Sequence, residues 1–352
     1  MCGIIGIVSK NGVVDRLIDG LVRLEYRGYD SAGIATINSS EIVYSKSTGK
    51  LVSLTNKIKE NPIDGHVGIG HTRWATHGEP IEINAHPHVT KNVAVVHNGI
   101  IENFAEFKDE LLEKGIIFNS QTDTEVIAKL IEEKISKEKC GPLEAVRLTI
   151  EKLRGSFALC FIFKGFEDLI VVTRRGSPLA LGFGDGENFV SSDALSLSIF
   201  SKKICYLEEG DLATLTSDEV KIYDSFGNSV FRDTQILYTD PINLSKGQYK
   251  HFMEKEIFEQ PEVISQVLGY YLNAFEGTLS LPPLPQSTEI KRIILVGCGT
   301  AFYSCLAAKY WFENLSGIPT HAELASEFRY RSPVVCKDDL LIFVSQSGET
   351  AD

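Results

Sequence analysis

The residue with the clearest chemical potential is Cys2, which directly follows the initiator Met1. Small residues surround Cys2, and removal of Met1 by an aminopeptidase would leave it with both a thiol and a free α-amine. A free thiol titrates at about 8.5 and an α-amine at about 7.7–8.0, so the amine can act as a base near neutral pH. A nucleophile that carries its own N-terminal base is a known solution for amide cleavage. The alternative is an ordinary core residue, because buried cysteine behaves as a small hydrophobe.

A dense polar run follows the strand that apolar alternation predicts over residues 66–72. The Arg73 side chain has the planar fork that binds a carboxylate at two points. Trp74, which comes next, has the size to cover a cavity and exclude water. The alternative is a surface arginine stacked on a tryptophan.

Asn98 and Gly99 directly follow the apolar strand predicted over residues 92–97. A side-chain amide and a glycine N–H are natural donors to a developing oxyanion. An Asn-Gly pair is also common in turns. Here it is followed by a helix that begins near Phe104 and ends at Gly115, so the pair joins a strand to a helix and not two strands of a hairpin.

Residues 122–125 read Thr-Asp-Thr-Glu, which predicts a capping box for a helix over residues 126–135. Thr122 would cap the helix, and Glu125 would supply the returning carboxylate. Asp123 then has no capping duty. Two roles stay open for Asp123, namely stabilising the helix N-terminus and binding an ammonium group.

Five histidines lie within or near these motifs, which raises the question of a metal site. Their spacing matches no zinc pattern such as H-E-x-x-H, and no run of cysteine or acidic ligands accompanies them. We therefore expect hydrogen-bonded structural histidines in preference to a metal centre. The five are His71, His77, His86, His88 and His97.

Apolar periodicity predicts sheets that are covered by helices. Helices are expected over residues 15–26, 104–115, 126–135 and 143–153. Strands are expected over residues 4–8, 34–37, 41–46, 66–72, 92–97, 156–164, 169–174, 188–192, 212–215 and 219–223. Grouped apolar strands with paired helices fit a four-layer αββα sandwich, a fold of the α/β (α+β) class, over residues 2–217.

The composition is that of an ordinary soluble protein with about two domains. The 352 residues are 43% apolar and 23% charged, and the net charge is −12. This acidity argues against bulk binding to nucleic acid or to an anionic membrane, and no apolar stretch is long enough to span a bilayer. The seven cysteines are scattered and form no C-x-x-C pair, which favours a reducing cytoplasm over a disulfide framework.

The later residues predict a connector and the beginning of a second domain. Residues 249–259 predict an amphipathic helix that breaks before Pro261, and a proline-rich stretch beyond it predicts a stiff spacer. A buried strand over residues 293–296 leads through a glycine turn into a helix over residues 302–315, an arrangement that cradles phosphate. The strand over residues 340–344 leads into a hydroxyl-rich loop at which the sequence stops, and we expect a longer natural protein.

Together these motifs resemble those of the class II glutamine amidotransferases, which are N-terminal-nucleophile hydrolases. The resemblance rests on residues 2–6, 73–78, 97–99 and 122–125, and residues 25–33 and 345–350 further resemble class II members that carry a sugar isomerase domain. It implies that Cys2 is the nucleophile, that a γ-glutamyl thioester forms, and that the Cys2 α-amine acts as base through a water. It also implies roles for neighbouring residues: Asn98 and the Gly99 N–H as the oxyanion hole, Arg73 for the glutamine α-carboxylate, Asp123 for its α-ammonium, Thr76 and His77 as helpers, and Trp74 as the gate of an ammonia channel.

The last part of the chain resembles the sugar isomerase (SIS) domain. The two resemblances divide the chain into a glutaminase domain at residues 2–217, a connector at residues 218–285 and the truncated start of a first SIS domain at residues 286–352. They imply a sugar-phosphate site made of Thr300, Ser345, Gln346, Ser347 and Thr350. Ala301 stands where many relatives carry serine, so one contact to the sugar or phosphate would be missing.

Class II members with an SIS domain use L-glutamine and D-fructose 6-phosphate and form L-glutamate and D-glucosamine 6-phosphate. The resemblance therefore implies a cytoplasmic aminotransferase of hexosamine biosynthesis. It also implies a homodimer without metal or organic cofactor and without nucleic-acid or membrane partners. It places the acid–base residues of isomerisation beyond Asp352, so that this sequence would retain only the glutaminase half.

Two rival functions stay open. Another class II amidotransferase should carry a phosphoribosyl-diphosphate loop or an ATP-pyrophosphatase loop where residues 345–350 stand. A sugar-phosphate sensor with a decayed glutaminase half is the second rival. Intact Cys2, Arg73, Asn98 and Asp123 argue against such decay.

Overall fold

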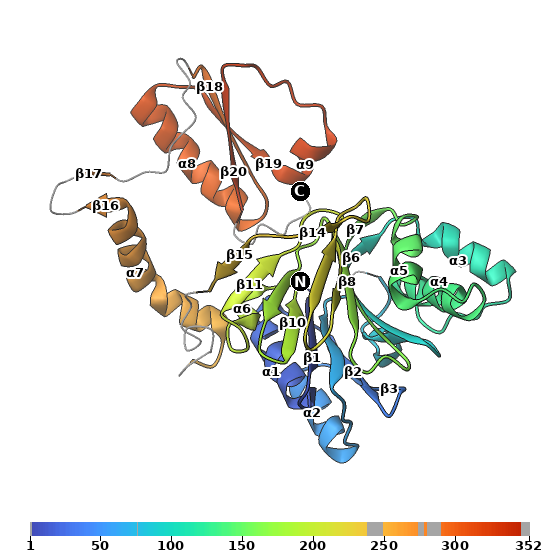
Figure 1. Cartoon of the computed structure of the whole chain (residues 1–352). Helices are drawn as coiled ribbons and strands as arrows, with labels where there is room; N and C mark the ends of the chain where they lie inside the picture. The colour runs from blue at the N-terminus through green and yellow to red at the C-terminus, as the bar shows by residue number, and fades with distance from the viewer. Residues whose placement is uncertain (1, 76, 238–248, 274–277, 280–289, 346–352) are drawn as a thin grey trace. The chain divides into compact units, whose positions relative to one another are not determined.

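The computed structural model describes residues 2–75, 77–237, 249–273, 278–279 and 290–345. The chain divides into two compact units, Met1–Phe252 and Met253–Asp352. In the described part of the first unit, two β-sheets are covered by helices, and the second unit contains a small sheet with helices beside it (Figure 1).

The first sheet of the described residues has eight strands in the order β15-β11-β9-β10-β1-β4-β2-β3, all antiparallel. Its strands are β1 (Gly3–Ser9), β2 (Ser31–Asn38), β3 (Glu41–Thr48), β4 (Val67–Arg73), β9 (Ala180–Phe183), β10 (Glu187–Ser191), β11 (Lys203–Tyr206) and β15 (Thr234–Ile236). β1 is interior, with β10 on one side and β4 on the other. The predicted strand at residues 4–8 is confirmed, and Cys2 directly precedes it.

The second sheet of the described residues has seven strands in the order β14-β13-β12-β8-β7-β6-β5. Its strands are β5 (His88–Val89), β6 (Val93–Ile101), β7 (Gly155–Phe163), β8 (Ile170–Arg175), β12 (Leu212–Leu215), β13 (Val220–Tyr223) and β14 (Ser229–Val230). β6 pairs with β7 along its whole length, from Val93 opposite Phe163 to Ile101 opposite Gly155. This long pairing places Asn98 and Gly99 inside β6, opposite Ala158 and Phe157, so the prediction that they join the strand to a helix is wrong.

Helices cover the outer face of each sheet. α1 (Val14–Leu24), α2 (Leu51–Glu60) and α6 (Ala194–Leu197) pack on the first sheet, and α3 (Phe104–Glu113), α4 (Thr124–Ser136) and α5 (Pro142–Ile150) pack on the second. Short 3₁₀ turns lie at η1 (Glu25–Arg27) and η2 (Glu82–Asn84).

Alternation along β1 explains why these layers form. Ile4 and Val8 point between the two sheets, where they pack with residues of the second sheet such as Val96. Ile5 and Ile7 point the other way, into a cluster with α1 and α2. All four are fully buried, and burying a side chain of this size contributes about 1.5–3 kcal/mol. The predicted four-layer αββα sandwich is thereby confirmed.

The predicted capping box is wrong. α4 begins one residue after Asp123, whose backbone is already helical and whose side chain makes no cap hydrogen bond. The Glu125 carboxylate instead accepts from the Ser120 N–H at 2.6 Å, and the Thr122 hydroxyl bonds the His88 ring at 2.9 Å. Both side chains that the motif assigns to the helix end, Thr122 and Glu125, therefore hydrogen-bond to groups outside the helix.

Two features differ from the expected connector. α7 (Phe252–Tyr271) continues through Pro261, so the predicted break is wrong. A proline inside a helix costs about 3 kcal/mol, yet the residues on both sides keep helical backbone. In addition, β13, β14 and β15 extend the two sheets of the first unit beyond residue 217, to residue 236.

The second unit contains a three-stranded parallel sheet among its described residues, in the order β19-β18-β20. Its elements are β18 (Arg292–Gly297), α8 (Thr300–Ser316), β19 (Thr320–Leu324), α9 (Ala325–Tyr330) and β20 (Asp339–Val344), and a short pair β16 (Leu272–Asn273) and β17 (Thr278–Leu279) precedes them. Ile293 and Leu295 are buried against Cys305 of α8. No helix in the described ranges is both long and apolar enough for a membrane span.

Candidate active site

Four segments that are distant in sequence meet at one small cavity of about 20 Å³. These are the start of β1, the end of β4 with the residues after it, the end of β6, and the start of α4. The register of β1 with β4 places Gly3 opposite Thr72, so that Cys2 lies beside Arg73 and Trp74. The lining residues are Cys2, Arg73, Trp74, His77, His86, His97, Gly99, Thr122, Asp123 and Thr124.

The Cys2 thiol lies against the backbone of Trp74. The Trp74 N–H donates to Cys2 Sγ at 3.2 Å, and Sγ lies 3.5 Å from the Trp74 carbonyl oxygen. Burial raises the pKa of the Cys2 thiol, and the hydrogen bond from the Trp74 backbone opposes part of that rise. A thiol in this position requires a nearby base to become a thiolate at neutral pH.

The Cys2 carbonyl oxygen is held by two side chains. Asn98 Nδ2 donates to it at 3.3 Å, and Arg27 Nη1 donates at 3.4 Å. The Arg27 side chain is almost fully buried and lies 3.5 Å from the Asp193 carboxylate. Arg27 is therefore a packed cation and not a solvated one.

Gly99 occupies a backbone position that excludes every side chain. Its φ is +115°, and a Cβ built there would lie 2.0 Å from the Ser156 carbonyl oxygen on β7. The residue before it, Asn98, is buried, and its Oδ1 lies 3.0 Å from His71 Nε2. Gly99 therefore lines the same cavity as Cys2, and Asn98 contacts the Cys2 carbonyl oxygen. Their role as an oxyanion hole stays a prediction.

The Arg73 guanidinium holds the chain that follows it. It donates to the backbone carbonyl oxygens of His77, Gly78 and Glu79, at 3.2 Å for the bond to Glu79. The Asp30 carboxylate lies 3.8 Å from it. Arg73 lines the cavity, and its guanidinium already donates to backbone carbonyl oxygens. A bound carboxylate would accept hydrogen bonds from the same guanidinium beside them.

Asp123 is buried at the start of α4. Its Oδ2 accepts from the Ile101 N–H at 2.9 Å, and the same oxygen lies 3.9 Å from His97 Nδ1. The other oxygen lies 3.5 Å from the Thr124 hydroxyl. The carboxylate is therefore fixed at the cavity wall, in agreement with its predicted place near the helix N-terminus.

Trp74 and His77 lie at the rim. The Trp74 side chain is 54% exposed, with its ring 3.1 Å from the position that a Cβ on Gly28 would take. The His77 ring makes an edge contact with Phe104 at 5.5 Å between centroids. Sequence reasoning missed Asp30, which accepts from the Ala75 N–H at 2.5 Å and steadies this rim. Thr76 lies outside the described residues.

Four of the five histidines form a buried cluster at the cavity, and each of these four makes a hydrogen bond, as predicted. His86 lies between His71 and His88, tilted against the first at 4.2 Å and edge-on to the second at 4.8 Å between ring centroids, and accepts from the His97 N–H at 3.4 Å. His97 Nδ1 bonds the Thr124 hydroxyl at 2.9 Å. In the part of the chain that the structure describes, no group of three or more His, Cys, Asp or Glu residues is arranged to hold a metal ion.

The histidine cluster predicts acid sensitivity. Burial lowers the pKa of His71 to about 3 and lowers the pKa values of His86, His88 and His97 below the ordinary 6.5. As pH falls below about 6.5, the unfolded chain binds protons at these rings and the folded protein does not. The free energy of unfolding should therefore fall toward acid, by up to about 1.4 kcal/mol per pH unit for each ring.

Urea unfolding between about pH 7 and about pH 5.5, where most carboxylates stay ionised, measures this slope. The matched control is His66→Gln, which removes an exposed histidine and should leave the slope unchanged. A free energy of unfolding that stays constant over this range would contradict the expectation.

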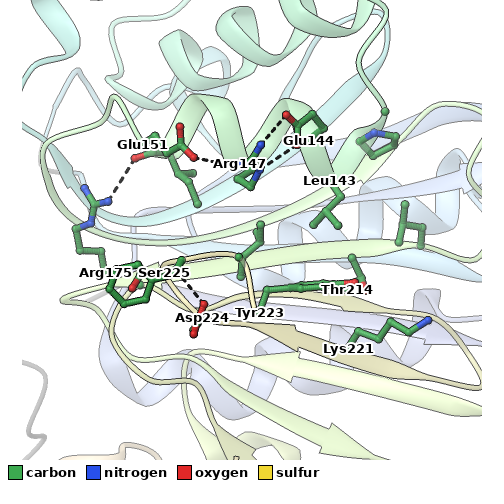
Figure 2. A pocket seen from close by; sticks show the side chains of 18 residues that line it. Leu143, Glu144, Arg147, Glu151, Arg175, Thr214, Lys221, Tyr223, Asp224 and Ser225 are labelled. Atoms are coloured by element: carbon green, nitrogen blue, oxygen red, sulfur yellow. Dashed lines mark hydrogen bonds and ion pairs between the residues drawn. The ribbon is translucent and has the colours of Figure 1, made fainter. Parts of the chain in front are cut away.

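The first unit also contains a larger cavity, of about 770 Å³, between α5 and the end of the second sheet (Figure 2). Its charged side chains have partners on the protein. Arg147 lies 2.8 Å from Glu144 and 3.1 Å from Glu151, and Arg175 donates to the Leu153 carbonyl at 2.6 Å. The lining residues include no cysteine or histidine, whereas the smaller cavity contains Cys2, His77, His86 and His97.

In the second unit, the register of the parallel sheet brings the two predicted loops together. Gly297 at the end of β18 lies opposite Val344 at the end of β20. Thr300 begins α8 after Gly299, whose φ is +58°, and Ser345 directly follows β20. Both residues therefore lie at the carboxyl edge of the sheet, where α/β folds bind phosphate. Gln346, Ser347 and Thr350 lie outside the described residues.

Comparisons with known families agree with this geometry. The family model described as "Glutamine amidotransferase domain" matches residues 71–198, and the model described as "SIS domain" matches residues 288–352. The chain belongs to the class II glutamine amidotransferases, and part of an SIS domain follows its amidotransferase domain.

Within that class, three curated relatives are named glutamine--fructose-6-phosphate aminotransferase (isomerizing). They come from Zymomonas mobilis, Mesorhizobium japonicum and Bartonella quintana and are 49%, 50% and 51% identical to this chain. Each match covers 100% of this chain and 58% of the relative, so the chain spans a little over half the length of these proteins.

Solved structures support the fold. A glutamine phosphoribosylpyrophosphate amidotransferase from B. subtilis matches with a TM-score of 0.58 at 19% identity, covering 91% of this chain and 65% of that one. A second structure, an allosteric regulatory enzyme of purine biosynthesis, matches with a TM-score of 0.57 at 22% identity, covering 91% of this chain and 64% of that one. The fold is that of the N-terminal-nucleophile hydrolases.

Proposed function

We propose that this protein hydrolyses L-glutamine at Cys2, and that the whole protein transfers the ammonia to D-fructose 6-phosphate, forming D-glucosamine 6-phosphate and L-glutamate. The observation that carries the proposal is the convergence of Cys2, Gly99 and Asp123 from three segments around one cavity, with Asn98 bonded to the Cys2 carbonyl oxygen. The curated relatives, which are 49–51% identical over the full chain, are named for fructose 6-phosphate, and this supports D-fructose 6-phosphate as the acceptor.

The chemistry follows from these groups. The Cys2 thiol attacks the γ-carbonyl carbon of glutamine, while the Cys2 α-amine, free after loss of Met1, takes the thiol proton through a water. The carbonyl oxygen gains negative charge, which the Asn98 amide and the Gly99 N–H stabilise. The tetrahedral intermediate collapses to a γ-glutamyl thioester and ammonia, which leaves with the returned proton. Water then hydrolyses the thioester to glutamate and restores the thiol.

The rest of the glutamine molecule is a zwitterion, so its binding needs one fixed cation and one fixed anion. Arg73 supplies the cation for the α-carboxylate, and Asp123 supplies the anion for the α-ammonium. Both are buried at the cavity wall, where such contacts are stronger than in water. Thr76 and His77 assist in binding glutamine, and Trp74 closes the path by which ammonia leaves.

Removing either charge should weaken the use of glutamine. Arg73→Ala and Asp123→Ala should each lower kcat/KM roughly 30-fold or more, because each leaves one charge of the zwitterion unpaired. This corresponds to a loss of a few kcal/mol of transition-state stabilisation. Steady-state release of glutamate measures the loss.

Conservative variants separate charge from structure. Asp123→Asn keeps an acceptor for the Ile101 N–H, and Arg73→Lys keeps the charge but loses the fork. If Asp123→Asn hydrolyses glutamine as well as the unaltered protein, Asp123 does not bind the ammonium group.

The sugar half of the proposal rests on the second unit. Thr300 and Ser345, with Gln346, Ser347 and Thr350, form the site for the phosphate and hydroxyl groups of D-fructose 6-phosphate. The parallel register that aligns Gly297 with Val344 supports this pairing of loops. The whole protein acts in the cytoplasm as a homodimer, uses no metal or organic cofactor, and binds neither nucleic acid nor membrane.

An electrophilic glutamine analogue tests the glutaminase proposal directly. A diazoketone that mimics glutamine should form one covalent adduct, located by mass spectrometry on an N-terminal Cys2 that has lost Met1. Excess glutamine should protect against labelling, and excess asparagine should not. Labelling at another cysteine, such as the exposed Cys336, without labelling at Cys2 would contradict the proposal.

The division of labour between the two halves is open to a simple assay. A polypeptide of residues 2–352 should release glutamate and ammonia from glutamine but form no D-glucosamine 6-phosphate. The residues proposed for hydrolysis all lie before residue 217, whereas we propose that those for isomerisation lie in the part of the relatives that this chain does not cover. Incubation with both substrates and separate assays for glutamate and amino sugar test this. Amino sugar formation by this polypeptide would show that the division is mistaken.

A further inference from the structure

We propose that His71 is a positioning residue that fixes the direction of the Asn98 side-chain amide and so points its NH2 group toward the main chain of Cys2. The proposal rests on the proposed glutaminase function, in which that NH2 group is an oxyanion donor. His71 has no contact with Cys2 Sγ among the contacts of the described residues, so it acts only through Asn98.

The geometry begins with one ring nitrogen between two oxygens. His71 lies on β4 and is fully buried. Its Nε2 lies 2.9 Å from the His97 carbonyl oxygen and 3.0 Å from the Asn98 Oδ1. The other face of the Asn98 amide, Nδ2, lies 3.3 Å from the Cys2 carbonyl oxygen.

The backbone carbonyl of His97 decides the protonation of this nitrogen. A carbonyl oxygen can only accept, and the main chain on β6 cannot turn it away, because β6 is paired with β7 at this position. His71 Nε2 must therefore carry the hydrogen. In the other tautomer, its lone pair would face two oxygens, and the N–H at Nδ1 would be buried without a partner among the described residues.

The tautomer in turn decides the orientation of Asn98. The two orientations of an asparagine amide differ only in their hydrogen bonds, because O and N exchange places. With a hydrogen on His71 Nε2, the orientation with NH2 toward His71 sets donor against donor. The orientation with Oδ1 toward His71 satisfies both groups and leaves the NH2 facing Cys2.

Burial keeps this device constant across pH. A charged imidazole would donate from both nitrogens, but burial lowers the pKa of His71 to about 3, so the ring is neutral near neutral pH. His86 packs against the ring at a tilt, at 4.2 Å between centroids, and limits its rotation. The direction of the Asn98 donor is therefore set before substrate arrives, which is what preorganised stabilisation of an oxyanion requires.

The test uses two amide side chains that differ by one methylene. His71→Gln places an amide nitrogen at the position of His Nε2, and His71→Asn reaches only the position of Nδ1. We expect His71→Asn to lower kcat for glutamine by about 10- to 100-fold with little change in KM, because a misdirected donor affects the transition state. His71→Gln should restore most of the rate. Equal rates for the two variants would overturn the proposal.

A double-mutant cycle with Asn98→Ala distinguishes positioning from a general structural role. Once the Asn98 amide is gone, His71→Asn should cost less than about 3-fold more, since it has nothing left to orient. The matched control is His88→Asn, which alters a buried histidine that bonds Thr122 and not Asn98, and should cost the same factor in both backgrounds. An equal cost of His71→Asn in both backgrounds would overturn the positioning role.

The outcomes also separate this proposal from the one on which it rests. Absence of glutamine hydrolysis by the unaltered protein would overturn the glutaminase function and the role of His71 with it. Hydrolysis by the unaltered protein together with an additive cycle would overturn the role of His71 alone. Circular dichroism and thermal unfolding of each variant confirm that the compared proteins are folded.

Discussion

Cys2→Ala is expected to abolish glutamine hydrolysis, with a fall in rate of about 10⁴-fold or more, because no other described group at the cavity can form the thioester. The protein should stay folded, since alanine keeps the Cβ of cysteine and lacks only the sulfur atom. Glutamate release, measured beside the thermal unfolding midpoint, tests both halves of this expectation.

Two controls make the result specific. Cys336→Ala removes an exposed thiol of the second unit and should leave the rate unchanged. A protein that retains Met1, made in cells whose methionine aminopeptidase is inhibited, keeps the thiol but lacks the free α-amine on Cys2. It should be inactive as well, and normal turnover by a protein shown to retain Met1 would exclude the amine as the base.

Asn98→Ala is expected to lower kcat by roughly 10²–10³ with KM little changed, the usual cost of losing one oxyanion donor. The structural reason is that Asn98 Nδ2 bonds the Cys2 main chain. The α-carboxylate and α-ammonium of glutamine are proposed to bind elsewhere, at Arg73 and Asp123. Single-turnover formation of the thioester measures the chemical step directly. A change confined to KM would assign Asn98 to substrate binding instead.

Asn98→Asp is the sharpest companion to that variant. It has nearly the same shape and keeps an oxygen to accept from His71 Nε2, but it replaces the NH2 group with an oxygen. An oxygen facing a developing oxyanion repels it, so this variant should be at least as slow as Asn98→Ala. A fast Asn98→Asp enzyme would show that the NH2 group is not the donor.

The fold was predictable where one element carries its own pattern. The run at residues 4–8 alternates between two apolar environments, so both its strand character and its burial follow from the sequence. The same holds for α1 and for β6, whose apolar residues repeat at regular spacing. The pairing order of the strands did not follow, because β1 pairs with β10, about 185 residues away, through contacts that no local pattern encodes.

The site was predictable in its residue types and not in its contacts. Polar or reactive residues beside an apolar strand or at the start of a helix are uncommon and can be recognised in the sequence. This applies to Cys2, Asn98, Gly99 and Asp123. The carbonyl partners of Arg73 depend on how the chain turns after β4, and no spacing rule gives that. The capping box failed for the same reason, since Glu125 finds the Ser120 N–H in a loop that precedes the helix.

The position of β1 has a consequence for how activity and unfolding are related. Its backbone is hydrogen-bonded along both edges, to β4 and to β10, and both of its faces are covered. Small opening motions, which free only frayed ends and exposed loops, therefore cannot detach the segment next to the thiol. Its amide hydrogens should be among the last to exchange with solvent. The nucleophile therefore directly precedes a strand that should open only when the first unit unfolds as a whole.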